Sequence, residues 1–383
     1  MMAAMAKNSK VKGAKAAAKA RAKTTKKLTK KAEKAALKEA TRQAKKAGKK
    51  AGKKAARKAS TKGKDKPEKP TGEGLPATAP VEVVESAGTE ESAAKVTKEV
   101  KEDAGVKKRF SEVLAFTRGD QLADISPDST PGFAGDQKDG EEALADCTKR
   151  LGQLQERLFA ESKGGGRRSV LLVIQGMDTS GKGGILDHVV GAVGPQGVRI
   201  TSFKAPSAEE RAHDFLWRIE NALPGPGQIG VFDRSHYEDV LIVKVHSLVP
   251  GDVLRRRYTE INAFERKVAA AGTTIVKVML HISADEQKAR LLARLADPEK
   301  LWKYNPGDVT ERAHWDEYQA AYQVALTRCS TKTAPWHVVP ANNKWYARLA
   351  VQQLLLEAMT DMAPVFPAAS YDLEVETERV KDS

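Results

Sequence analysis

The chain has 383 residues, enough for two average domains or for one larger domain with appendages. It contains two cysteines, Cys147 and Cys329, which excludes a disulfide-built secreted scaffold and favours a cytoplasmic protein with reduced thiols. The N-terminal residues do not form a signal peptide, because lysines begin at Lys7, and no stretch approaches the roughly 18–20 apolar residues of a membrane span. We therefore expect no contact with a membrane.

The net charge of +15 is distributed unevenly along the chain. Residues 1–70 contain 26 Lys and Arg against four Asp and Glu, so this segment carries +22 and the remainder −7. A segment so rich in Lys and Ala cannot bury enough apolar surface to offset its ordering entropy, which predicts a disordered tail. The tail resembles the arms of bacterial linker-histone-like proteins. Residues 71–105 predict a second disordered segment, an acidic linker.

A single folded domain is expected over residues 106–366, followed by an acidic C-terminal tail over 367–383 that frays. Leucines at helical spacing predict a helix over 141–161. Five apolar runs, separated by helical patterns, then predict strands at 170–174, 198–203, 229–232, 274–280 and 336–339. Continuous apolar strands that alternate with helices predict an α/β fold, a three-layer α/β/α sandwich with a five-stranded parallel sheet covered on both faces.

The first predicted strand leads directly into the glycine-rich segment 176–184, and a helical pattern follows. This segment matches the phosphate-binding loop G-x-x-x-x-G-K, the Walker A motif, in its required strand–loop–helix setting. Lys182 is expected to reach the terminal phosphates, and Gly183 replaces the usual Mg²⁺-binding Ser or Thr, so Asp178 would supply the missing oxygen ligand. The expected phosphate-binding residues of the loop are Gly176, Ser180, Gly181, Gly183 and Gly184.

The third predicted strand ends in Asp233, which Arg234 follows. An apolar strand ending in aspartate is the Walker B pattern, which places a metal-binding carboxylate beside the phosphate loop. We expect Asp178 and Asp233 to hold Mg²⁺ at the carboxyl ends of their strands. Arg234 is expected to clamp a phosphate, and a structural Asp–Arg ion pair is the alternative. His236 is expected to be a structural hydrogen-bonding residue.

A basic helical segment at about 285–335, between the fourth and fifth predicted strands, is expected to form a lid over the site. Arg290 and Arg294 lie four residues apart, hence on one helical face, where their charges repel unless an anion lies between them. Arg294 is expected to act like an arginine finger, and Arg290 to bind phosphate. A solvated basic helix face is the alternative for both arginines.

Two further lysines complete the expected site. Lys204, which follows the second strand, is expected to line the path of the acceptor, and Lys303 in the lid is expected to bind phosphate. The tryptophans of this half of the chain, Trp302, Trp315 and Trp336, are expected in the core.

These motifs together resemble the polyphosphate kinase 2 family. The resemblance spans about residues 110–365 and continues, in the family's order, through the blocks Pro195–Val198, Phe203–Pro206, Leu216–Arg218, Asp233–Glu238, Asp297–Pro298, Trp302–Lys303 and Ala334–Trp336. It implies a P-loop kinase-like fold and Mg²⁺-dependent phosphoryl transfer between inorganic polyphosphate and a nucleotide (AMP or ADP, giving ADP or ATP). It also implies a homo-oligomer, a dimer or tetramer.

The resemblance gives the site residues roles. Asp178 and Asp233 would hold the metal and phosphates, and Lys182 would bind the transferring phosphate. Arg234 and Arg294 would bind polyphosphate or stabilise the transferring group. The acceptor stays open, because the Tyr-Glu-Asp sequence at 237–239 resembles the subgroup that accepts monophosphates, whereas the glycine after Lys182 is common among diphosphate-specific relatives.

Two other functions are alternatives. An ATP-dependent nucleoside monophosphate kinase shares the phosphate loop and lid, but Gly183 and the block Asp233–Glu238 count against it. A nucleoid-binding protein with a degenerate kinase body would use the +22 tail, but the intact residues Asp178, Lys182 and Asp233 count against degeneration. Whatever the function of the folded domain, we expect the tail to bind nucleic acid or polyphosphate. Binding to DNA would associate the protein with the nucleoid.

Overall fold

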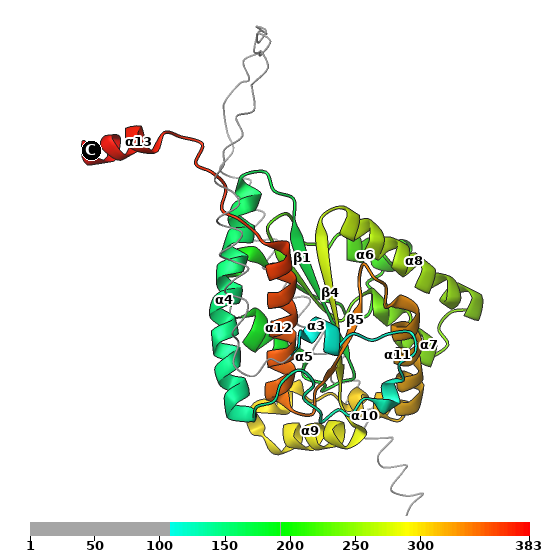
Figure 1. Ribbon diagram of the computed structural model, residues 1–383. Coiled ribbons are helices and arrows are strands. Elements are labelled where there is room, and N and C mark those ends of the chain that lie inside the picture. The colour runs from blue at the N-terminus through cyan, green and yellow to red at the C-terminus, as the bar shows by residue number, and fades with distance from the viewer. Residues whose placement is uncertain (1–107, 192) are drawn as a thin grey trace, which may run out of the picture. The chain divides into compact units, whose positions relative to one another are not determined.

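The computed structural model describes residues 108–191 and 193–383, shown in Figure 1. The expectations for the basic tail over 1–70 and the linker over 71–105 lie outside these residues. Within the described part of the chain, no helix has the length and apolarity required to cross a bilayer.

Five parallel strands form one sheet in the order β2-β3-β1-β4-β5. Their bounds are β1 (Ser169–Gly176), β2 (Val198–Ser202), β3 (Ile229–Asp233), β4 (Thr273–His281) and β5 (Trp336–Pro340). All five predicted strands are confirmed, with ends that shift by at most two residues. The central strand β1 is buried along its whole length, as its continuous apolar sequence requires. The edge strand β2 stays partly exposed.

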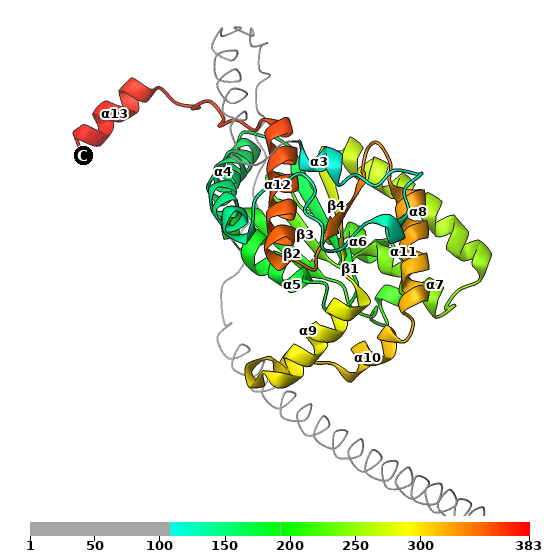
Figure 2. The same ribbon diagram turned by 60° about the horizontal axis from the view of Figure 1, so that its bottom comes forward.

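Helices cover the two faces of the sheet (Figures 1 and 2). One face carries α3 (Phe110–Val113), α4 (Gln137–Lys163), α5 (Lys182–Ile185) and α12 (Lys344–Met362). The other carries α6 (Trp217–Glu220), α7 (Ile242–Val245), α8 (Gly251–Ala270) and α11 (Trp315–Cys329). The expected three-layer α/β/α sandwich is therefore confirmed. The long helix α4 begins with a capping box at Asp136 and Asp139, which explains why it starts before the predicted residue 141.

The segment between β4 and β5 is helical, as predicted for a lid. It consists of α9 (Ala284–Ala296), the 3₁₀ turn η7 (Pro298–Lys303), α10 (Pro306–Arg312) and α11. The last of these helices buries Tyr322, Ala325 and Leu326 in the core, whereas η7 and α10 bury no residue. Only α9 to α10 therefore project from the core as a lid.

One expectation for the tryptophans is wrong. Trp336 is buried and Trp315 packs against the core, but Trp302 is 79% exposed. None of the residues of η7 is buried, so its apolar side chains face solvent. The Lys303 ammonium lies 5.0 Å from the centre of the Trp302 ring and covers part of it.

The C-terminal segment also differs from its expectation. Instead of fraying after Ala363, the chain forms a further helix, α13 (Leu373–Lys381). Asp372 caps its first turn, and Glu376–Arg379 and Glu378–Lys381 ion pairs support it locally. Nearly all of its residues are exposed.

A buried polar network joins four elements of the core. The fully buried Lys277 on β4 donates hydrogen bonds to Glu265 Oε2 (2.7 Å), to the Tyr237 hydroxyl (2.8 Å) and to the Cys329 carbonyl (2.7 Å). Glu265 Oε1 accepts from the Tyr237 hydroxyl (2.8 Å) and lies 3.3 Å from His236 Nε2. Burial alone raises the pKa of Glu265, but Lys277 and His236 together hold it below its usual value. His236 thus has the expected structural position.

Replacing Lys277 with Met should destabilise the fold by about 3–5 kcal/mol, because Glu265 would keep a buried charge without its cation. The free energy of unfolding in urea measures this loss. The double variant Lys277→Met/Glu265→Leu should recover most of it, since neither charge then remains buried. Lys267→Met, which removes an exposed lysine paired with Glu220, should cost less than about 1 kcal/mol. Equal losses in the single and double variants would contradict this account.

Candidate active site

The phosphate loop follows β1 with a sharply turned backbone. Gly176 and Gly181 adopt φ angles of +151° and +115°. A Cβ on Gly176 would lie 2.6 Å from Ser180 Oγ and 2.8 Å from the Leu280 carbonyl oxygen, so no other residue fits there. Thr179 also adopts a left-handed φ of +65°, a conformation that its surroundings must stabilise. The loop is therefore held in one tight, strained shape.

Lys182, the first residue of α5, folds back over this loop. Its Nζ donates to the carbonyl oxygens of Gly176 (2.8 Å) and Met177 (3.3 Å). Burial lowers the pKa of Lys182, an effect that the Asp178 charge opposes. The amine thus lies among the backbone groups that surround a terminal phosphate in phosphate-loop proteins. A Cβ on Gly183 would meet no atom within 4 Å, so steric exclusion does not explain the missing Ser or Thr.

The Walker B residue lies on the strand next to the loop. β1 and β3 pair so that Ile174 faces Asp233. Asp233 Oδ2 accepts a hydrogen bond from Ser202 Oγ (3.2 Å), whereas Oδ1 is buried and has no hydrogen-bond partner among the described residues. A buried carboxylate oxygen without a partner is costly, which makes this atom a candidate ligand for a cation.

The donor set suits Mg²⁺ bound together with phosphates. The described residues contain no group of three or more His, Cys, Asp and Glu side chains that could hold a metal. Mg²⁺ in phosphoryl-transfer sites needs only one or two protein carboxylates, because phosphate oxygens and waters complete its coordination. Asp233, with its unpartnered oxygen, and Asp178 in the neighbouring loop fit this requirement.

Arg234 connects the two motifs. Its backbone is left-handed, with a φ of +64°, and its Nη2 lies 3.1 Å from Asp178 Oδ1. Both side chains remain partly exposed, so a phosphate can reach the guanidinium. Glu238, which was not among the expected site residues, lies nearby. Burial raises the pKa of Glu238, an effect opposed first by Arg234 and then by Lys182.

Arg290 on α9 has a different environment from the one expected of a phosphate-binding residue. It is buried, and its guanidinium makes five hydrogen bonds. The acceptors, at 2.6–3.0 Å, are the Glu286 carboxylate and the carbonyl oxygens of Thr179, Ser180, Ala341 and Asn342. These bonds use all five donors of an arginine. Arg290 therefore braces the phosphate loop against the segment that follows β5.

Gln287 adds a second brace that the sequence analysis missed. It is buried, and its Nε2 donates to the Asp178 carbonyl oxygen (3.0 Å). Its position three residues before Arg290, on the same helical face, was the available signal in the sequence. The loop is thus held from the lid helix at three consecutive carbonyl groups.

The other expected lid residues lie further from the loop's centre. Arg294 Nη1 is 3.1 Å from the Lys303 carbonyl oxygen and 3.3 Å from Asp308 Oδ2. Burial raises the pKa of Asp308, and the Asp178 charge adds to this rise. Asp308, which the sequence analysis did not single out, therefore lies within electrostatic reach of the loop. Lys204 is exposed after β2. The structure thus groups Asp178, Lys182, Asp233 and Arg234 without bringing Lys204 or Lys303 into contact with them.

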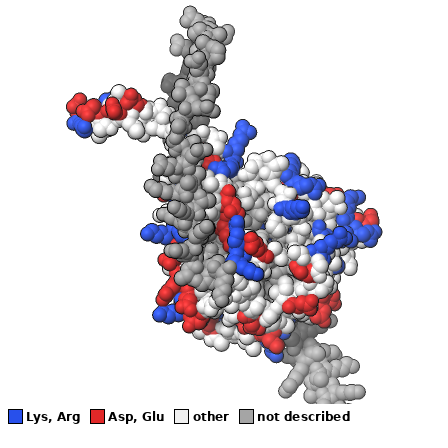
Figure 3. Space-filling view, viewed as in Figure 1, with Lys and Arg blue, Asp and Glu red and all other residues white. Residues whose placement is uncertain are grey.

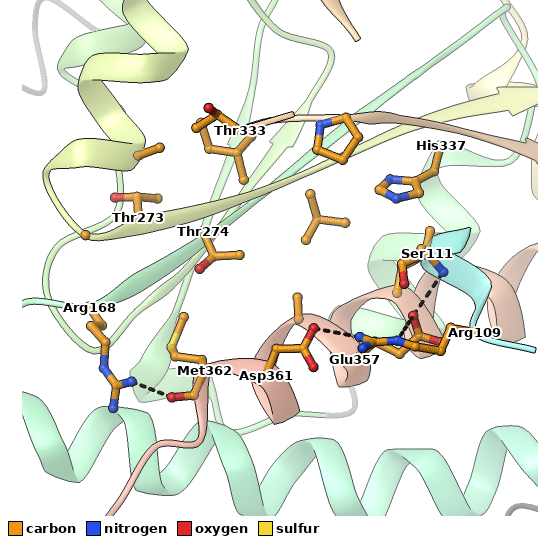
Figure 4. A pocket seen from close by; sticks show the side chains of 17 residues that line it. Arg109, Ser111, Arg168, Thr273, Thr274, Thr333, His337, Glu357, Asp361 and Met362 are labelled. Atoms are coloured by element: carbon orange, nitrogen blue, oxygen red, sulfur yellow. Dashed lines mark hydrogen bonds and ion pairs between the residues drawn. The ribbon is translucent and has the colours of Figure 1, made fainter. Parts of the chain in front are cut away.

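A separate cavity of about 570 Å³ lies at the opposite edge of the sheet, where β4 begins (Figure 4). Its charged lining residues are already paired, since Arg109 Nη2 lies 2.6 Å from Asp361 Oδ2 and Arg168 bonds to the Met362 carbonyl oxygen. It does not contain the residues of the phosphate loop. Figure 3 shows acidic and basic side chains interspersed over the visible described surface.

A phosphate loop, a Walker B aspartate on the adjacent parallel strand and a helical lid define a P-loop kinase-like protein. Residues 134–367 match the model of the family Polyphosphate kinase 2, and the chain belongs to this family.

Known proteins that are similar to the chain carry corresponding names. An AMP/ADP-polyphosphate phosphotransferase from Meiothermus ruber is 46% identical over 247 residues, 64% of this chain and 91% of the relative. An ADP-polyphosphate phosphotransferase from Rhodopseudomonas palustris is 44% identical over 59% of this chain and 81% of the relative. The crystal structure of a polyphosphate kinase 2 from Arthrobacter aurescens is similar with a TM-score of 0.72 and 55% identity, covering 73% of this chain and 99% of that one.

The bracing role of Arg290 predicts that charge alone cannot replace it. Arg290→Gln and Arg290→Lys should each lower the free energy of unfolding by at least about 2 kcal/mol, because several loop carbonyls lose charge-assisted hydrogen bonds. Urea unfolding and steady-state kinetics measure the effect, and turnover should fall in both variants. If Arg290→Lys kept normal turnover while Arg290→Gln lost it, direct contact with phosphate would be the better explanation.

Proposed function

We propose that the protein transfers a phosphoryl group between inorganic polyphosphate and the nucleotides AMP and ADP, with Mg²⁺ as cofactor. The observation that carries this proposal is the meeting of Lys182, Asp178 and Asp233 at adjacent strand ends in a chain of this family. The Meiothermus relative is named for both acceptors and the Rhodopseudomonas relative for ADP alone, so we propose that both nucleotides are accepted.

The reaction joins two phosphate compounds, which determines what the site must supply. No proton has to be removed from carbon or from an alcohol, so positioning and charge neutralisation provide most of the catalysis. The proposed catalytic residues agree with this requirement, because they include no Ser–His or Cys–His pair; they are Asp178, Lys182, Asp233, Arg234 and Arg294.

The residues of the loop and of β3 would divide this task. The backbone N–H groups of the loop and Lys182 bind the phosphoryl group that is transferred, and Arg234 holds a neighbouring phosphate. Mg²⁺, when bound, neutralises phosphate charge and fixes the phosphates relative to one another. Asp178 and Asp233 would hold it, the latter through its unpartnered Oδ1.

Arg294 would complete the charge clamp from the lid. Its guanidinium is held by Asp308 and by the Lys303 carbonyl oxygen, and it is 26% exposed. An incoming phosphate offers a stronger acceptor than either, so substrate binding would draw Arg294 toward the loop as the lid closes. A cationic group supplied in this way stabilises the charge of the transition state.

The first experiment supplies the purified protein with Mg²⁺, long-chain polyphosphate and either AMP or ADP. We expect ADP and ATP to form from AMP, and ATP from ADP. Lys182→Ala and Asp233→Asn should each lower turnover by about 10²–10³-fold, the usual cost of removing one electrostatic contact from a transition state. Asp252→Asn, an exposed carboxylate on α8, serves as the control. Exchange between ATP and AMP without polyphosphate would instead support an ATP-dependent kinase.

We further propose that the +22 segment over residues 1–70 binds polyanions, either nucleic acid or polyphosphate, within the cytoplasm. Deleting it should weaken retention on both polymers and reduce the salt dependence of binding, while turnover with AMP stays unchanged. Filter binding across a salt series measures this. Equal retention with and without the segment would contradict the proposal.

A further inference from the structure

Two basic side chains lie on the first turns of α12, and one of them, Arg348, lies beside the phosphate loop. Lys344 and Arg348 are four residues apart, so they project from the same face of the helix. The Arg348 guanidinium lies 3.8–3.9 Å from the Cβ position of Gly184, the last glycine of the loop. α12 also packs against α5, the helix that begins with Lys182 (Figure 2).

Among the described residues, these two cations have no hydrogen-bond or ion-pair partner, unlike four other cations of the site. Lys182, Arg234, Arg290 and Arg294 each bond to a carbonyl or carboxylate group. The side chains of Lys344 and Arg348 form no hydrogen bond or ion pair within residues 108–191 and 193–383. Arg348 is nonetheless half-buried.

The surroundings of the pair are also basic. Lys344 is exposed, but partial burial lowers its pKa, and Arg290, Arg348 and Lys300 lower it further, while Glu286 is the acidic group that opposes them. Glu286 is already bonded to Arg290 at 2.6 Å, and Lys300 to Asp297 at 2.6 Å. Positive charges gathered at this point repel one another, and an anion bound between them would relieve this repulsion.

We propose that Lys344 and Arg348 form a phosphate-binding site that holds the polyphosphate chain where it leaves the phosphate loop. The proposal rests on the function proposed above and assigns residues to its donor substrate. In the sheet, β3 lies on one side of β1, whereas β4 and β5 lie on the other side. Arg234 follows β3 and α12 follows β5, so the two groups flank Lys182 from opposite sides.

This arrangement fits a linear polyanion better than a nucleotide. AMP and ADP carry one or two phosphates, which Lys182 and one flanking arginine can satisfy. A polyphosphate chain carries a negative charge at every unit, and therefore interacts with cations on both sides of the loop at once. The sequence signal is Lys-x-x-x-Arg on the helix after the last strand, a region outside the motifs recognised in the sequence.

The test compares the full-length protein with Arg348→Gln, Lys344→Gln/Arg348→Gln and the control Arg266→Gln, an exposed arginine of α8. The KM for long polyphosphate should rise about 10-fold or more in the double variant, the loss expected for charge-assisted hydrogen bonds. The kcat should stay within about twofold and the KM for AMP should not change. Arg348→Lys should recover part of the loss.

A second readout does not depend on turnover. Long polyphosphate should raise the Tm of the wild-type protein, and the rise should shrink in the double variant but not in Arg266→Gln. Polyphosphate that binds the basic N-terminal segment equally well in the folded and the unfolded chain does not raise the Tm. Only a ligand that prefers the folded state stabilises the protein. Unliganded Tm values that match the wild type would show that the variants fold.

The outcomes separate this proposal from the proposed function. An unchanged polyphosphate KM together with an unchanged rise in Tm would overturn the site. A raised KM for AMP alone would also overturn it, because the pair would then bind the acceptor. If the wild-type protein showed no polyphosphate-dependent turnover while its rise in Tm depended on Arg348, the proposed function would fail and the phosphate site would stand.

Discussion

The parallel pairing of β1 with β3 is the constraint on which the site depends. Ile174 faces Asp233 in this pairing, and the Arg234 N–H donates to the Ile174 carbonyl oxygen at 3.1 Å. The strand that leads into the phosphate loop and the strand that carries the Walker B carboxylate therefore end side by side. Parallel strands have their carboxyl ends at the same edge of the sheet, so residues far apart in the sequence meet there through strand pairing alone.

The loop at this edge is strained, and the surrounding elements compensate for it. Three of its carbonyl groups accept bonds from Arg290 and Gln287 on α9, while Lys182 bonds to two others. Beneath the site, Lys277 joins β4 to the turn after β3 through Tyr237. The backbone N–H groups of the loop are thereby fixed before a phosphate arrives, which is the condition for electrostatic catalysis without reorganisation.

Two arginines of the candidate site are each paired with a carboxylate beside them. Arg234 is paired with Asp178, and Arg294 with Asp308. In the proposed function, substrate phosphates would replace these carboxylates, so that binding exchanges one ion pair for another and leaves the carboxylates available to a cation. Lys344 and Arg348 stand apart because neither is ion-paired with a carboxylate among the described residues, the observation on which the proposed polyphosphate site rests.

The sequence by itself determined the five strands, the phosphate loop, the Walker B aspartate and the presence of a basic helical lid. These features depend on local patterns, namely apolar runs, glycine spacing and strand-terminal aspartate, which the chain carries whatever its neighbours are. Only the tertiary structure decided the roles of Arg290 and Trp302, because the depth of a side chain depends on which elements pack over it. Arg290 on α9 is buried and donates to carbonyl groups of the loop, whereas Trp302 lies on a turn that contains no buried residue. The proximity of Arg348 to Gly184 likewise arises from the packing of α12 on α5, a contact between segments 164 residues apart that no local pattern encodes.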